Sequence, residues 1–318
     1  MPLRIVFCGT PAFALPSLRA LIAEPDFRVE AVITQPDRPR GRGGELSSSP
    51  VKAAAIESGI EVYQPEKIKS DPAFDFLHRL APDVIVIIAY GQIISQRLLD
   101  IPRLGWVNVH ASLLPKYRGA APINWAIING ETRTGVTTMQ VSAGLDTGPI
   151  LLKSETHIGP DETAQELAAR LAELGAPLIV ETLRRLAGGE ITPQPQDDSQ
   201  ASLAPLLKRD DGRIDWSQPA HSVYNRIRGL QPWPGAFTTF RGKTCHVWGQ
   251  PVTQLKTDAA PGTIPMPGTI LTENRELAVA CGSGTILELE FVQLEGRKRI
   301  TAREFASGAR LSPSERFV

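Results

Sequence analysis

Short apolar segments alternate with helical segments in the first half of the chain, and this alternation most restricts the possible folds. Residues 4–9, 29–34 and 83–89 are short and rich in Val and Ile, which is typical of strands buried on both faces of a parallel sheet. Helical patterns at 16–23 and 72–80 separate them. The order predicts a doubly wound, Rossmann-like α/β sheet with 83–89 near its centre. The other expected strands lie near residue 62 and at 105–109, 135–140 and 150–155, and the other expected helices at 51–58, 121–129 and 163–186.

The turn after the first strand, Gly9-Thr10-Pro11, lacks the GxGxxG pattern that cradles a dinucleotide. We therefore predict no dinucleotide cofactor. Ligands are still expected at the carboxyl ends of the central strands, where open α/β sheets bind them. Residues 35–49 are rich in Pro, Gly and Ser, which predicts a mobile surface loop.

The composition changes after residue 189. Residues 190–207 are rich in Pro, Gln, Asp and Ser, which is typical of an interdomain linker. Beyond them, short apolar segments are separated by Gly and Pro turns, which predicts a small β-barrel. These segments centre on Phe237, Val247, Ile270, Leu277 and 286–292. The predicted domains are thus 1–189 and 208–318, joined by 190–207.

Charge and cysteine content limit the compartment and the partners. The net charge of the 318 residues is zero, but 15 Lys and Arg against 11 Asp and Glu follow from Pro205 onward, a local charge of +4. A basic C-terminal half suits a polyanionic partner. Cys8, Cys245 and Cys281 are too widely spaced for a disulfide framework, and each is expected to be a small buried apolar side chain. With no signal peptide or bilayer-spanning run in the sequence, we expect a monomeric cytoplasmic protein without a membrane partner.

Asn108 and His110 lie two residues apart at the end of a predicted strand, so their side chains should lie on the same side of it. An amide can donate to a developing oxyanion, and an imidazole can carry protons between an attacking and a leaving nitrogen. Asp146 could orient such an imidazole. Taken singly, each residue type at these positions is more often structural, as a turn former or a buried polar group.

The string NVHASLLPKYRG at 108–119, followed by Asp146 in an Asp-Thr-Gly turn, resembles the 10-formyltetrahydrofolate-dependent formyltransferases. The segment SLLPKYRGAAPI at 112–123 is most similar to the members that formylate methionyl initiator tRNA. The resemblance implies catalysis by Asn108, His110 and Asp146, and an OB-like C-terminal domain. It also implies that 10-formyltetrahydrofolate binds the segment formed by Ser112, Leu113, Leu114 and Pro115.

The same resemblance implies that a basic loop carrying Arg42 engages the acceptor stem of the tRNA. Other basic residues are candidate phosphate contacts, although basic clusters are usually solvated faces. The candidates are Lys208, Arg297, Lys298 and Arg299, with Arg209, Arg226 and Arg228 beside them.

Several polar and aromatic residues have a structural expectation instead. Residues 116–118 form either a solvated turn or the entrance of the site. Trp233, between two prolines, is expected to be a packed structural residue. The histidines outside the motif lack metal-ligand spacing, so we predict no metal.

Three alternative functions remain open at this point. A formyltransferase for an amino sugar or an amino ribonucleotide would use the same three catalytic residues. A formyltetrahydrofolate hydrolase would replace the amine with water. An RNA-binding protein that has lost catalysis is disfavoured by the presence of all three residues.

Overall fold

The computed structural model describes residues 1–40, 45–252, 265–273, 276–312 and 315–318. The chain divides into two compact units. The first contains residues 1–122, 133–157 and 167–205, and the second contains residues 123–132, 158–166 and 206–318. Arg42 lies outside the described residues.

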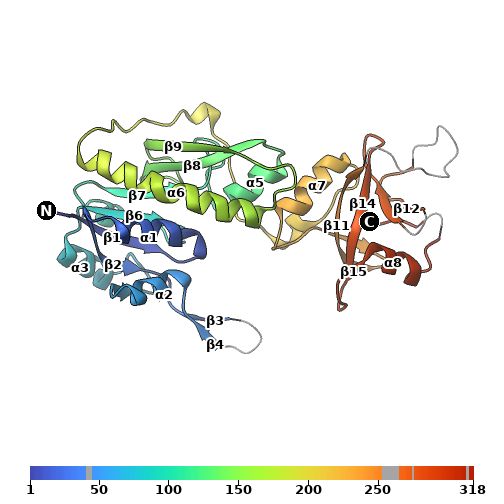
Figure 1. Cartoon of the computed structure of the whole chain (residues 1–318), viewed down its shortest axis with the longest axis horizontal. Coiled ribbons are helices and arrows are strands. Elements are labelled where there is room, and N and C mark those ends of the chain that lie inside the picture. Colours follow the sequence, from blue (N-terminus) through green and yellow to red (C-terminus); the bar gives the residue numbers. More distant parts are fainter. Residues whose placement is uncertain (41–44, 253–264, 274–275, 313–314) are drawn as a thin grey trace. The chain divides into compact units, whose positions relative to one another are not determined.

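A seven-stranded sheet forms the first unit, in the order β5-β2-β1-β6-β7-β8-β9 (Figure 1). Its strands are β1 (Leu3–Gly9), β2 (Phe27–Ile33), β5 (Glu61–Tyr63), β6 (Val84–Ile88), β7 (Trp106–His110), β8 (Arg133–Gln140) and β9 (Ile150–His157). The first five run parallel, and β6 is central, which confirms the sequence prediction. β8 and β9 run antiparallel to their neighbours.

Helices cover the parallel strands because those strands are apolar on both faces. They are α1 (Leu15–Ala23), α2 (Pro50–Glu57), α3 (Asp71–Leu80), α4 (Gln96–Leu99) and α6 (Ala164–Ala187). On one face, Val6 and Cys8 of β1 join Phe76 and Leu77 of α3 in a buried cluster.

Helix α6 packs closely on the Val109 side of β7, because Gly175 lets the two elements approach. A Cβ at Gly175 would lie 3.1 Å from Val109 Cγ1. Side chains alternate along a strand, so Asn108 and His110 lie on the opposite side of β7 from Val109. Asn108 and His110 therefore face away from α6.

The second unit contains a six-stranded antiparallel sheet, an OB-like half-barrel in the order β10-β11-β14-β13-β12, with β15 paired to β14. Its strands are β10 (Phe237–Phe240), β11 (Lys243–Val252), β12 (Ile270–Glu273), β13 (Glu276–Ala280), β14 (Ile286–Leu294) and β15 (Ile300–Thr301). Helices α5 (Pro122–Ile128), α7 (Ala220–Gly229) and α8 (Ala302–Gly308) accompany it. Val223 and Ile227 of α7 and Phe305 of α8 enter the core of the sheet. Helices α7 and α8 were not among the elements predicted from the sequence.

Two local features of the structure differ from the sequence predictions. Within the predicted loop 35–49, the short strands β3 (Arg38–Arg40) and β4 (Glu45–Ser47) pair antiparallel. Trp233 is 56 % exposed, so the prediction of a packed residue was wrong. Its flanking prolines and Gly235, at φ +75°, turn the chain so that the ring stays on the surface.

Candidate active site

Asp146 is the point on which the predicted catalytic residues converge. Its Oδ1 accepts from Asn108 Nδ2 at 3.4 Å, and its Oδ2 lies 3.6 Å from His110 Nδ1. The Gly119 N–H donates to the same Oδ2 at 2.9 Å. Contacts from Asn108 and His110 to one carboxylate show that both side chains lie on the same side of β7, as their spacing predicts.

Both ring nitrogens of His110 face oxygen atoms. Nε2 lies 2.9 Å from the carbonyl oxygen of Tyr117, and Nδ1 faces the Asp146 carboxylate. A carbonyl oxygen only accepts, so Nε2 carries a hydrogen in this contact. The ring is buried, whereas 16 % of the Asp146 side chain is exposed and Asn108 is half-buried. The site therefore opens to solvent on the side of the amide and the carboxylate.

The backbone of Asp146 has φ +50°, in the left-handed region that asparagine and aspartate tolerate better than most residues. Leu145 beside it is 66 % exposed. Hydrogen bonds therefore hold the position of Asp146 more than side-chain packing does.

The predicted folate segment has a mixed environment. Ser112 and Leu114 are fully buried, and Leu113 and Pro115 are partly exposed. Ser112 Oγ donates to the Lys116 carbonyl at 2.7 Å, which closes the turn. Only the partly exposed residues and the backbone of this segment can meet a ligand directly.

In the turn that follows, Lys116 is exposed but the next two residues are buried, which corrects the expectation of a solvated turn at residues 116–118. Tyr117 is 7 % exposed and Arg118 is 6 % exposed. Arg118 donates to Gln196 Oε1 and to Asp198 Oδ1. The guanidinium charge is thus paired with acceptors inside the protein.

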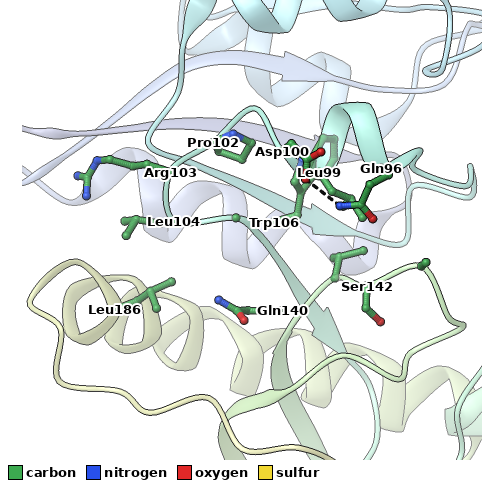
Figure 2. A pocket seen from close by; sticks show the side chains of 13 residues that line it. Gln96, Leu99, Asp100, Pro102, Arg103, Leu104, Trp106, Gln140, Ser142 and Leu186 are labelled. Carbon is green, nitrogen blue, oxygen red and sulfur yellow. Dashed lines mark hydrogen bonds between the residues drawn. The ribbon is translucent and has the colours of Figure 1, made fainter.

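A cavity of about 570 Å³ lies in the first unit, and none of the four predicted folate residues lines it. Figure 2 shows Gln96, Leu99 and Leu104 on one side and Gln140 and Leu186 on the other. Gln96 donates to Asp100 at 2.7 Å.

Trp106 also lines this cavity, and so do Ser142 and Ala143 of the loop that leads to Asp146. Trp106 is two residues from Asn108 on β7, so both residues belong to one face of the strand. At about 3.3 Å per residue, the cavity begins roughly 7 Å along the strand from Asn108. Trp106 is the first residue of β7, so the cavity lies at the amino end of this strand and not at the carboxyl ends where ligands were expected. No sequence pattern indicated this cavity, because strands and a loop distant in sequence build it.

The four basic residues proposed for the second unit, Lys208, Arg297, Lys298 and Arg299, are all exposed. The Arg299 guanidinium lies 4.3 Å from the ring centroid of Trp248 and 3.9 Å from that of Phe291.

Arg228, another candidate phosphate contact, is buried. It donates to Asn225 Oδ1 and to the carbonyls of Gly159 and Glu162. This prediction was wrong, since a guanidinium committed to internal acceptors is not available to a phosphate.

Among the described residues, no cluster of three or more His, Cys, Asp and Glu could hold a metal ion. Within the same part of the chain, every helix is too short or too polar to cross a membrane.

Comparison with protein families identifies the class of protein. Residues 3–183 match the Formyl transferase family, and residues 206–310 match the Formyl transferase C-terminal domain. The chain belongs to the formyl transferase family.

Two relatives are similar over nearly their whole length. A methionyl-tRNA formyltransferase of Solibacter usitatus is 57 % identical over 99 % of this chain and 98 % of its own. One of Geobacter sulfurreducens is 52 % identical over 99 % of this chain and 96 % of its own. Among solved structures, WlaRD, a sugar 3N-formyl transferase crystallised with dTDP and 5-N-formyl-THF, has a TM-score of 0.65 at 17 % identity. That match covers 94 % of this chain and 100 % of WlaRD, and at this identity it shows the shared fold.

Proposed function

We propose that the chain transfers a formyl group from 10-formyltetrahydrofolate to the α-amino group of methionyl initiator tRNA, in the cytoplasm and as a monomer. The observation that carries the proposal is the convergence of Asn108 and His110 on Asp146. The similarity to methionyl-tRNA formyltransferases over 99 % of the chain supports this acceptor rather than an amino sugar.

The three residues supply what amine formylation needs. Asn108 has a second amide hydrogen besides the one directed at Asp146, and this hydrogen can donate to the oxyanion formed when the amine attacks the formyl carbon. Because Nε2 already carries a hydrogen, His110 takes up at Nδ1 the proton that the attacking nitrogen loses and returns one to the departing nitrogen of the folate. Asp146 orients the imidazole and stabilises its charged form. The amine attacks directly, so no acyl-enzyme forms.

Replacing each of these residues with alanine tests the catalytic roles. We expect Asn108→Ala to lower kcat by about 10²–10³-fold through loss of an oxyanion donor. For His110→Ala and Asp146→Ala we expect about 10²–10⁴-fold, because proton transfer is lost or misdirected. Single-turnover rates measure the effect, and denaturation midpoints verify that the fold survives. Near-normal turnover by the His110 variant would exclude its role.

The cavity beside Trp106 is the proposed place for the pteridine ring. Its volume lies in the range of small-molecule pockets, roughly 300–1,000 Å³. Leu99 and Leu104 give it apolar walls, and Gln140 and Ser142 offer polar groups for ring nitrogens. The resemblance implies that the folate binds the segment Ser112, Leu113, Leu114 and Pro115, and this segment is also a proposed folate contact.

Two variants separate these folate contacts. Ala143→Phe should fill the cavity and raise the KM for 10-formyltetrahydrofolate about tenfold, equivalent to about 1.4 kcal/mol. Leu113→Ala should raise the same KM less, since the removed side chain is only partly exposed. Neither should change the KM for the tRNA. An Ala143→Phe enzyme with an unchanged folate KM would place the ring elsewhere.

The exposed basic residues Lys208, Arg297 and Lys298, together with Arg299 and Arg42, are the proposed contacts to the tRNA. Removing any one side chain that binds a phosphate should reduce the salt dependence of binding by about one unit of slope. Arg42→Ala and Lys298→Ala should weaken tRNA binding and leave the folate KM unchanged. An equal loss of folate affinity would contradict these assignments.

The acceptor itself is tested by incubating the protein with 10-formyltetrahydrofolate and, separately, methionyl initiator tRNA, candidate amino sugars and water alone. Mass spectrometry then shows which acceptor gains a formyl group. Formylation of the sugar in preference to the tRNA would contradict the proposal, and so would hydrolysis as the main outcome.

A further inference from the structure

Residues 194–204, which lie inside the predicted linker, pair with the first unit. We call this segment the strap. Gln194 exchanges backbone hydrogen bonds with Ile150 at 2.8 and 2.9 Å. Farther along, Ser202 O accepts from the Arg118 N–H at 2.8 Å, and the Ala204 N–H donates to Arg118 O at 2.7 Å. The strap is thus hydrogen-bonded to the sheet at one end and to the 108–119 motif at the other.

Between these two ends, the side chain of Gln196 reaches the Asp146 loop. Its Nε2 donates to the carbonyl of Asp146 at 2.8 Å and to that of Gly148 at 2.7 Å. Its Oε1 accepts from Arg118 Nε at 3.0 Å and Nη2 at 2.8 Å. A guanidinium only donates and a carbonyl only accepts, so this amide has one possible orientation.

Arg118 holds the Gln196 amide in place because its buried guanidinium depends on acceptors within the protein. The residue is 6 % exposed, and a buried guanidinium needs acceptors. Gln196 and Asp198, both in the strap, provide them, the second at 2.8 Å. The chain of contacts therefore runs from the motif through the strap and back to the Asp146 loop.

These hydrogen bonds reach the Asp146 backbone at a place where side-chain packing does little to hold it. The residue adopts φ +50°, and Leu145 before it is mostly exposed. The net contribution of two hydrogen bonds is of the same order as the cost of a left-handed residue, so the pair from Gln196 can hold this conformation. In this position, the carboxylate meets Asn108, His110 and the Gly119 amide.

We propose that Gln196 is a positioning residue for the reaction, which orients the Asp146 carboxylate toward His110 and Asn108, and that Arg118 fixes Gln196. This inference rests on the proposed function of Asp146. Gln196 does not touch the reacting atoms and acts through the backbone of residues 146–148.

Gln196→Glu is the most direct test. The new carboxylate still accepts from Arg118, but it presents an oxygen rather than N–H to the carbonyls of Asp146 and Gly148. We expect kcat to fall by about 10–100-fold, with the KM for folate and for tRNA within about twofold, because geometry rather than binding is impaired. Gln200→Glu is the matched control. Gln200 is exposed in the same strap, and its side chain donates to Asp197. Its kcat should stay at the wild-type value.

Coupling to Asp146 separates positioning from a general structural effect. If Gln196 acts through Asp146, the Asp146→Ala/Gln196→Glu double variant should have the kcat of Asp146→Ala alone. Additive losses would overturn the proposal, and so would a Gln196→Glu enzyme with wild-type kcat. Gln196→Met, which is uncharged and of similar length, should also lose kcat. A fully active Gln196→Met enzyme would equally overturn the proposal.

Amide hydrogen exchange gives a readout that does not depend on the acceptor. Exchange at the amides of residues 146–148 should accelerate in Gln196→Glu and Gln196→Met and stay unchanged in Gln200→Glu. Unchanged exchange in both Gln196 variants would show that the residue does not hold the loop. By contrast, a wild-type protein that formylates no methionyl-tRNA would contradict the proposed function and leave this measurement decisive for Gln196.

Discussion

Gly119 shows how a single residue connects the motif to the strap. Its φ is +127°, and a Cβ added there would lie 2.5 Å from the carbonyl oxygen of Ala204. Gly119→Ala should therefore lower the free energy of unfolding by on the order of 2 kcal/mol, from backbone strain and the collision together. It should also reduce kcat, since the Gly119 N–H donates to Asp146. Urea denaturation and steady-state kinetics measure the two effects.

Gly59→Ala is the control for Gly119→Ala. Gly59 has φ +69° with no atom within 4 Å of the added Cβ, so only the backbone cost of about 1 kcal/mol applies. Its kcat should be unchanged. Equal destabilisation by the two substitutions would show that the close approach to Ala204 does not contribute to the loss of stability.

Sequence patterns identified the site residues that lie close together in the sequence, and missed those whose partners are far away along the chain. The spacing of Asn108 and His110 was enough to place both on one face of a strand. Nothing in the composition of residues 190–207 distinguishes Gln196 from a residue of a solvated linker. Its role depends on contacts with Asp146, 50 residues away, and with Arg118, 78 residues away. No local pattern encodes such pairings.

At the scale of elements, α2 and α3 each begin after a serine, but only the serine before α2 caps its helix through its side chain. Ser49 Oγ accepts from the Lys52 N–H at 3.1 Å and shares a hydrogen bond of 2.8 Å with Thr34 Oγ1. Ser49→Ala should destabilise the protein by about 1–2 kcal/mol through loss of the cap and of the hydrogen bond to Thr34. Thermal unfolding measures the change.

Ser70 precedes α3 in the same position but makes no side-chain cap hydrogen bond. Both helices have Pro in the first turn, so Ser70→Ala matches the change without removing a cap. It should leave the unfolding midpoint nearly unchanged. A loss as large as that of Ser49→Ala would indicate that the cap is not the source of the effect.

The elements that the sequence did not predict carried weaker local signals than the central strands. Helix α8 starts with a capping box, Thr301 with Glu304, which the sequence displays and which could have predicted it. Helix α7 has Val223 and Ile227 four residues apart but no side-chain cap. The pairing of β3 with β4 lies in a segment rich in Pro and Gly, where strand propensity is low.

For the whole molecule, the pH dependence of stability follows from groups whose pKa changes on folding. Hydrogen bonds from Lys52 and Gln64 lower the pKa of Asp37 below its ordinary 3.8. Burial lowers the pKa of His246 below 6.5. Both groups bind protons less readily in the folded state, so their contribution is present above the unfolded pKa. It is lost as the pH falls through the folded pKa.

The free energy of unfolding should therefore begin to fall below about pH 6.5 and fall further below about pH 4. Urea midpoints between pH 8 and pH 3 measure this. His246→Asn should flatten the first decline, and Asp37→Asn should flatten part of the second. A wild-type midpoint that does not change between pH 7 and pH 5 would contradict the assignment of His246.

The sequence by itself determined the class of the first unit, the central place of β6, the β-rich second unit and the placement of Asn108 and His110 on one face of β7, because periodicity and spacing act within a few residues. The tertiary structure decided the antiparallel β8 and β9, the cavity beside Trp106, the burial of Arg118 and the attachment of residues 194–204. Each of these depends on which distant segments share backbone hydrogen bonds or exclude water together. That choice minimises the free energy of the whole chain, and no local window of the sequence contains it.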